Sequence, residues 1–161
     1  MSDKPLKQKG FTLIELVVAM IVGGMIVSAV ATGIVQLIKV NAFSSDSALA
    51  YTNVQNAGYW ISHDTVQAQE VSITEGFPTL KWVGWENDTH QVVYTLKDTG
   101  ELMRSYSING SIPENIVVAR YIVPGKPMCS FDGRVLTLEI QAKVGDRSAT
   151  RTYKVETRPF P

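Results

Sequence analysis

The spacing of apolar residues changes twice along this chain. Residues 11–38 form an almost unbroken apolar run in which Glu15 is the only charged residue. A helix needs about 20 apolar residues to cross the hydrocarbon of a bilayer, so this run is long enough to span one. The ten residues before it carry three lysines and one aspartate. They are typical of a basic targeting leader, not of a folded segment.

Beyond Lys39, apolar residues recur at spacings that place them on one face of a helix. No proline occurs between Pro5 and Pro78, so the pattern predicts one long helix from about residue 11 to about residue 70. A kink or an interruption stays open at the serine-rich residues 44–47. The second half of the helix must bury its apolar stripe against protein. The stripe consists of Ala50, Val54, Ala57, Ile61 and Ala68.

From Val71 onward the apolar period falls to two, which is typical of strands. Turn residues at 98–100 and 145–147 predict hairpins, and neighbouring strands should therefore pair antiparallel. An antiparallel sheet with one apolar face, preceded by a helix with one apolar stripe, gives a pilin-like α+β architecture of two layers. The predicted strands are 80–85, 91–96, 102–108, 116–123, 135–144 and 149–157.

Length and composition limit the classes of protein that the chain can be. It has 161 residues, of which 45% are hydrophobic, and its 15 basic residues balance its 15 acidic ones. A zero net charge argues against nucleic-acid binding through bulk electrostatics. The single Cys129 excludes an intrachain disulfide framework and a zinc ribbon. We divide the chain into a leader (1–10), a transmembrane and assembly helix (11–38), its amphipathic continuation (39–70) and a sheet domain (71–161).

The junction between leader and apolar run reads Lys9-Gly10-Phe11-Thr12-Leu13-Ile14-Glu15-Leu16. It resembles the processing signal of type IV prepilins and type II secretion pseudopilins. In that family the prepilin peptidase cuts after the glycine and methylates the new amino terminus, which by resemblance is Phe11 after cleavage at Gly10. The resemblance implies further partners: other pilin or pseudopilin subunits, the inner membrane and the assembly platform.

Glu15 carries the assembly hypothesis. An ionisable side chain in an apolar membrane segment is costly and is usually retained for a partner. If Phe11 becomes the new amino terminus, its positive charge on a neighbouring subunit pairs with Glu15 and lowers the cost of burying both. The alternative is that Glu15, five residues past Gly10, extends to the cytoplasmic interface. With the motif in place, the assembly role is favoured.

A competing processing signal lies inside the apolar run. Ala29-Val30-Ala31 has the A-x-A form that signal peptidase uses, and cleavage there would leave a secreted protein beginning at Thr32. The apolar segment before that site has about 18 residues, more than the usual range of roughly 7 to 15, and it contains Glu15. Processing after Gly10 is therefore preferred.

Three later stretches, 54–69, 92–105 and 134–140, resemble J-type minor pseudopilins. Major subunits of the family often close a carboxy-terminal loop with two cysteines. The lone Cys129 cannot form that bridge, which favours a minor subunit.

Several residues suggest other chemistry. Asp98-Thr99-Gly100 matches the aspartic-protease tripeptide, but that reaction needs two such aspartates, and a hairpin turn explains the single copy. His63 and His90 lack the spacing of a metal site, and we expect them on the solvated helix face and at a strand start. No nucleophile with a positioned base is evident, so we predict no enzymatic activity and no cofactor.

Two polar and aromatic groups remain to be placed. Glu86-Asn87-Asp88 offers oxygen ligands but lacks the spaced ligands of a recognised calcium loop. Three tryptophans suggest a stacking platform for sugars or nucleic acids, but Trp82 and Trp85 should fall on opposite faces of a strand. We expect core packing for Trp60 and for one of the other two.

These observations lead to one functional expectation and one alternative. The expectation is a minor pilin or pseudopilin, anchored by a single pass in the inner membrane, with a cytoplasmic amino terminus and an extracytoplasmic sheet domain. It then enters a type IV pilus or a type II secretion-like filament. The alternative is a membrane-anchored extracytoplasmic binding protein or adhesin that never enters a filament. The sequence does not distinguish a pilus from a secretion or DNA-uptake machine.

Overall fold

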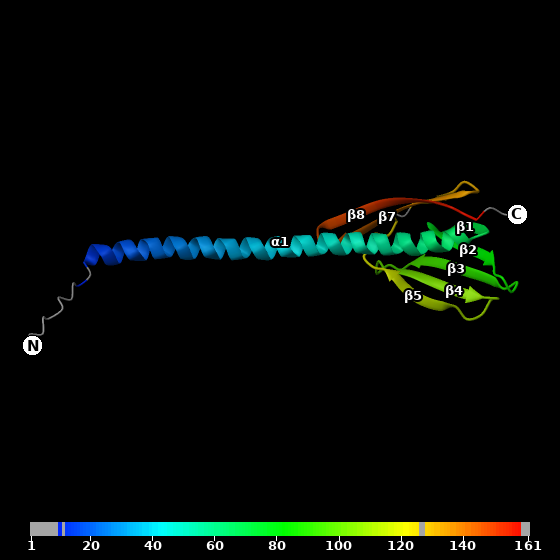
Figure 1. Cartoon of the computed structure of the whole chain (residues 1–161), viewed down its shortest axis with the longest axis horizontal. Coiled ribbons are helices and arrows are strands. Elements are labelled where there is room, and N and C mark those ends of the chain that lie inside the picture. The colour runs from blue at the N-terminus through cyan, green and yellow to red at the C-terminus, as the bar shows by residue number, and fades with distance from the viewer. Residues whose placement is uncertain (1–9, 11, 126–127, 159–161) are drawn as a thin grey trace, which may run out of the picture. The chain divides into compact units, whose positions relative to one another are not determined.

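A computed structural model describes residues 10, 12–125 and 128–158. The chain divides into two compact units, Met1–Ala42 and Phe43–Pro161. We call them the amino-terminal unit and the folded unit, and describe each by itself. One helix, α1 (Leu13–Gln67), contributes to both units (Figure 1).

The helix confirms the predicted position and length of the first element. The predicted helix ran from about residue 11 to about residue 70, and the observed helix has 55 residues, Leu13–Gln67. The helical assignment is unbroken through Ser44, Ser45, Asp46 and Ser47, where an interruption was left open. Ser and Thr hydroxyls elsewhere in α1 bond back to the carbonyl four residues earlier, as Thr52 does to Ala48 at 2.9 Å. Such bonds satisfy the hydroxyl without ending the helix.

The strands form two antiparallel sheets instead of the single sheet that the pattern predicted. The first is a five-stranded meander in the order β1-β2-β3-β4-β5, and the second is three-stranded in the order β6-β7-β8. The strands are β1 (Glu70–Thr74), β2 (Phe77–Val83), β3 (Thr89–Leu96), β4 (Leu102–Ile108), β5 (Glu114–Ala119), β6 (Met128–Phe131), β7 (Val135–Val144) and β8 (Arg147–Glu156).

Long alternating runs were predicted better than short ones. The ranges of β4 and β7 match the prediction, and hairpin turns lie at 98–100 and between β7 and β8 as expected. β1 and β6 were missed because four or five residues give too little alternation to recognise. The run 116–123 was wrong at its end, since β5 stops at Ala119 and Tyr121 adopts a positive φ of 61°.

The core of the folded unit lies where α1 packs between the two sheets (Figure 1). The predicted stripe from Ala50 to Ala68 is buried throughout. Gly58 lies on the same face, and a Cβ there would come within 2.0 Å of the Tyr153 ring. The Tyr153 hydroxyl donates to the Val54 carbonyl at 3.1 Å. Glycine at position 58 therefore lets β8 approach the helix closely.

Candidate functional site

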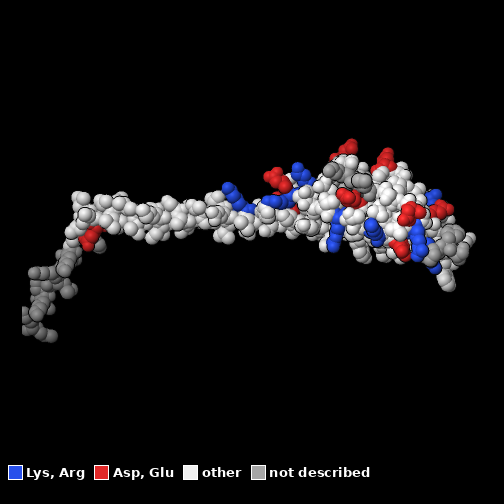
Figure 2. All heavy atoms as spheres, turned by 90° about the horizontal axis from the view of Figure 1, so that it is seen from above, with Lys and Arg blue, Asp and Glu red and all other residues white. Residues whose placement is uncertain are grey.

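The apolar part of α1 is the first functional feature. Of the described residues, those of α1 form the one helix long and apolar enough to cross a membrane. Its large side chains are exposed, including Leu13, Ile14 and Met20. Charged side chains gather instead over the folded unit, as Figure 2 shows. Exposed apolar surface of this extent needs a lipid or protein partner.

A capping box begins the helix. The backbone N–H and the hydroxyl of Thr12 both donate to Oε2 of Glu15, at 2.9 and 3.0 Å. The Glu15 N–H in turn approaches the Thr12 hydroxyl oxygen at 3.4 Å. This reciprocal pairing satisfies N–H groups that have no partner inside the helix. This capping box was not predicted, although Thr-x-x-Glu before an apolar run is its known signature.

The predicted processing residues lie next to this cap. Gly10 is exposed, and a Cβ there would meet no atom within 4 Å. Phe11, the predicted methylated residue, lies outside the described residues. Glu15 is also exposed, and the described residues give its Oε1 atom no hydrogen bond. One carboxylate oxygen is thus committed to the cap within the chain.

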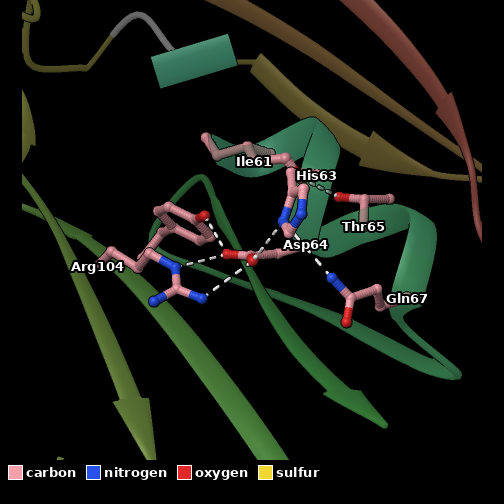
Figure 3. A network of polar contacts seen from close by, with 7 residues as sticks. Ile61, His63, Asp64, Thr65, Gln67 and Arg104 are labelled. Atoms are coloured by element: carbon pink, nitrogen blue, oxygen red, sulfur yellow. Dashed lines mark hydrogen bonds and ion pairs between the residues drawn. The ribbon is translucent and has the colours of Figure 1, made fainter. Parts of the chain in front are cut away.

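A buried ion pair joins the helix to the five-stranded sheet (Figure 3). The Asp64 side chain is only 1% exposed. Arg104 on β4 donates to it twice, from Nε at 2.7 Å and from Nη2 at 3.0 Å. The Tyr94 hydroxyl on β3 donates to Oδ2 at 2.5 Å. This bidentate, charge-assisted arrangement fixes α1 against two neighbouring strands.

The surroundings of this network explain its electrostatics. Trp60 and Tyr106 each hold the Arg104 guanidinium 5.1 Å from their ring centroids, a cation–π arrangement on both. The hydrogen bond to Asp64 raises the pKa of Arg104. Burial, with the Asp64 carboxylate next in importance, raises the pKa of Tyr94 far above its ordinary value. Tyr94 therefore stays a neutral donor, and the network is suited to structure and not to proton transfer.

This network was not predicted, although the sequence contains a signal for it. Asp64 lies three residues after Ile61 and four before Ala68, within the buried stripe of α1. A carboxylate on an apolar helical face requires a buried partner. Periodicity does not reveal that the partner is Arg104, forty residues later, because the pairing depends on sheet register.

The other candidate residues occupy ordinary structural positions. The His63 side chain is 53% exposed and lies 3.5 Å from Asp64, and His90 is the second residue of β3. Both positions confirm the prediction. In the 86–88 segment, Asp88 accepts a hydrogen bond from Asn109 at 2.6 Å. Within the described part of the chain, no three His, Cys, Asp or Glu side chains cluster as metal ligands.

The positions of Trp60 and Trp82 agree with the prediction, and that of Trp85 does not. Trp60 and Trp82 pack partly buried against the core, as expected. Trp85 was placed on the strand face opposite Trp82, but β2 ends at Val83 and Trp85 lies fully exposed in the turn that follows. The strand-face argument against a stacking platform therefore does not hold.

Cys129 on β6 is a free, half-buried thiol. Burial raises the pKa of this thiol to about 11. It is protonated at neutral pH, which makes it a poor nucleophile.

Comparison with known proteins gives one match. Residues 5–31 match the model of the prokaryotic N-terminal methylation motif. Neither the curated proteins nor the solved structures include a match to the chain. The matched range contains the leader junction, the capping box and the first 19 residues of α1.

Fold and motif together define a class. The protein has the pilin-like α+β fold, a long amino-terminal apolar helix packed against antiparallel sheets. Residues 5–31 carry the methylation motif, and in this motif and in its fold the chain resembles type IV pilins and pseudopilins. The motif is that of non-enzymatic structural proteins and implies processing by the prepilin peptidase. The apolar helix is consistent with the membrane anchor of a prepilin.

Proposed function

We propose that this chain is a minor pilin or pseudopilin of the J type, assembled into a type IV pilus or a type II secretion-like filament. The observation that carries the proposal is the methylation motif over residues 5–31, which includes the start of an apolar helix whose side chains are exposed. The folded unit has its own core, so the exposed helical segment is not needed to complete it.

Processing falls after Gly10, and Phe11 becomes the methylated amino terminus. The exposure of Gly10 and the free space around it fit access by a peptidase. Cleavage removes three lysines and one aspartate, so the formal charge changes from 15 minus 15 to 12 minus 14, or −2. The Thr12 and Glu15 capping box lies beyond the cut and is retained by the mature chain.

Glu15 has two parts in this proposal. Its Oε2 atom caps α1 of its own chain. Its Oε1 atom accepts from the amino terminus of a neighbouring subunit when the helices pack. A buried charge in a low-dielectric helix bundle is costly unless its partner is present. Pairing between Glu15 and the neighbour's amino terminus therefore favours one axial register between adjacent helices.

Orientation follows from the leader. Its lysines keep the amino terminus cytoplasmic, because basic residues flanking a membrane helix are retained on that side. The folded unit then faces outward. The functional segments are the leader (1–10), the membrane and assembly helix (11–38), its amphipathic continuation (39–70) and the sheet domain (71–161).

The minor rank rests on the lone Cys129 and on the likeness of three stretches to J-type subunits. A subunit that starts or ends a filament needs few copies and one specific set of neighbours. Quantitative mass spectrometry of purified filaments tests this rank. We expect far fewer copies of this chain than of the other subunits, because a position at the end of a filament occurs only once. Finding this chain as the dominant protein contradicts the minor rank and leaves the processing proposal standing.

A further inference from the structure

An open hollow of about 530 Å³ lies within the folded unit, beside the carboxy-terminal end of α1. Two tryptophans, two glutamines and one arginine contribute to its lining: Trp82, Trp85, Gln67, Gln69 and Arg158. They come from the end of α1, the segment before β1, the end of β2 with its turn, and the segment after β8. Residues distant in sequence thus converge on one surface, as they do in ligand sites.

The turn after β2 fixes the backbone at Trp85, whose side chain is fully exposed. The Asn87 N–H donates to the Gly84 carbonyl at 3.2 Å, and the Gly84 N–H donates to the Asp88 carbonyl at 2.7 Å. Asn109, in the loop between β4 and β5, donates to the Asp88 carboxylate at 2.6 Å. The backbone that carries Trp85 is therefore ordered before any ligand arrives, which lowers the entropic cost of binding.

Trp82 stacks on the His90 ring, which in turn stacks on Tyr106. The Trp82 centroid lies 5.3 Å from that of His90, with 4° between the planes. The Tyr106 hydroxyl lies 2.6 Å from His90 Nδ1 and fixes the imidazole in turn. Gly84 makes room for this stack, because a Cβ there would come within 2.5 Å of His90 Nε2.

The chemistry of the lining selects the ligand. Tryptophan faces carry partial negative charge and attract the weakly positive C–H groups of a sugar ring. The amides of Gln67 and Gln69 offer hydrogen bonds to hydroxyl groups, and the Gln69 Oε1 atom is held by the Val83 N–H at 3.0 Å, so its Nε2 atom is left to donate. These groups suit a polyhydroxylated molecule with apolar ring faces.

The charge around the hollow argues against a nucleic acid. Among the described residues that line the hollow, Arg158 is the only one with a charged side chain. Glu86 and Asp88 lie in the adjoining turn. Single-stranded nucleic acid requires a positive groove along its backbone in addition to aromatic stacking. An almost neutral, amide-lined surface fits an uncharged ligand.

We propose that this hollow binds a neutral saccharide chain, with sugar rings packed on Trp82 and Trp85 and their hydroxyls bonded to Gln67, Gln69 and Arg158. The site requires neither the leader nor Glu15. On the filament subunit proposed above, it adds recognition of envelope or surface glycans, and its test is independent of the processing proposal.

Isothermal titration calorimetry tests the site on the full chain, held in a zwitterionic detergent because a glycoside detergent would compete. The probes are cellotetraose and the tetramer of N-acetylglucosamine, with oligothymidylate as the nucleic-acid comparison. We expect saturable binding of at least one saccharide and a loss of about tenfold or more in affinity for Trp85→Ala. Gln67→Ala should weaken binding by a smaller factor.

Tyr51→Ala is the matched control, because Tyr51 is another exposed aromatic residue of the folded unit and does not line the hollow. It should leave saccharide affinity unchanged. Trp85 is fully exposed, so its replacement should not alter the denaturation midpoint. Absence of saturable saccharide binding, affinity that survives Trp85→Ala, or tighter salt-dependent binding of oligothymidylate overturns the proposal.

Discussion

Each part of α1 contains an acidic residue near apolar side chains, Glu15 in the first part and Asp64 in the second, and the two residues have different partners. In the amino-terminal unit, apolar side chains are exposed around Glu15, whose described partner is Thr12 at the start of the helix. In the folded unit, apolar side chains are buried on one face, and Asp64 is enclosed with Arg104 and Tyr94. The comparison teaches that a costly carboxylate has its partner inside the chain where the fold is complete. For Glu15, whose described partner is Thr12 of its own chain, we propose a second partner from a neighbouring subunit.

The largest effect is expected for assembly after Glu15→Leu. The variant should insert into the membrane at least as well as the parent chain, because a charge is removed from the apolar segment. It should fail to enter filaments or secretion complexes, because the neighbour's amino terminus loses its partner. Membrane fractionation and the subunit content of sheared filaments measure the two steps.

Thr12→Val separates pairing from capping. It removes the hydroxyl that bonds to Glu15 and keeps the carboxylate. If Glu15 acts through a neighbouring subunit, Thr12→Val should still assemble. Normal assembly of Glu15→Leu, or equal failure of both variants, would reduce Glu15 to a helix cap.

The second effect concerns the enclosed acid. Asp64→Leu leaves the Arg104 guanidinium, which is only 14% exposed, without its carboxylate. Breaking a buried ion pair in this way should lower the free energy of unfolding by about 3 to 5 kcal/mol. Denaturant unfolding of the full chain in detergent, followed by tryptophan fluorescence, measures the loss.

Two further variants sharpen this result. Asp98→Asn, in an exposed turn, should change the free energy of unfolding by no more than about 0.5 kcal/mol. Adding Arg104→Met to Asp64→Leu should recover part of the loss, because an apolar pair needs no charge compensation. A loss below about 1 kcal/mol for Asp64→Leu alone would show that the network does not anchor the helix.

Glycines of the same helix offer a third contrast. Gly58→Ala drives a methyl group into the Tyr153 ring and should cost about 1 to 3 kcal/mol of unfolding free energy. Gly23→Ala introduces a methyl group with no atom within 4 Å and should leave the unfolding of the folded unit unchanged. Thermal denaturation of both variants decides the matter, and equal midpoints would contradict the close approach of β8 to the helix.

The smallest effect involves Asp132, an exposed acid with local partners. It accepts the N–H groups of Arg134 at 3.0 Å and Val135 at 2.7 Å, and these bonds lower its pKa. A lowered pKa in the folded state means stability that is present above the unfolded pKa of about 3.9 and is lost as pH falls through the folded value.

Asp132→Ala should therefore shift the denaturation midpoint slightly at about pH 7, and the difference should shrink at lower pH as the parent carboxylate becomes protonated. Asp132→Asn keeps an oxygen acceptor without the charge and should show a smaller shift at about pH 7, which should also shrink as pH falls. If the difference in denaturation midpoint between the parent and Asp132→Ala grew on acidification, the stabilising role of the ionised carboxylate would be contradicted.

Prediction from sequence was best for segments in which the spacing of apolar residues reflects a single environment, either lipid or one buried face. The apolar run, the buried stripe of α1 and the alternating strands β4 and β7 follow from the period of apolar residues alone. The division of the strands into two sheets did not follow, because the short β1 and β6 carry too few residues to show a period.

Among the polar and processing residues too, local features were predicted and long-range ones were not. Gly10, Phe11 and Glu15 lie within six residues of one another, in a motif that can be recognised from the sequence alone. The contacts of Asp64 join α1 to β3 and β4 across 30 and 40 residues, and they exist only once the sheet register is formed. Trp85 was misplaced because the end of β2 at Val83 decides whether its side chain has a strand face at all.

Intact mass spectrometry of the protein purified from membranes of cells that contain the peptidase tests the central claim most directly. The account predicts a chain that begins at Phe11, lacks the ten leader residues and carries one added methyl group. Replacing Gly10 by a bulky residue should leave the leader attached. A parent chain that retains Met1 to Gly10 in those cells, or one that begins at Thr32, would contradict the account.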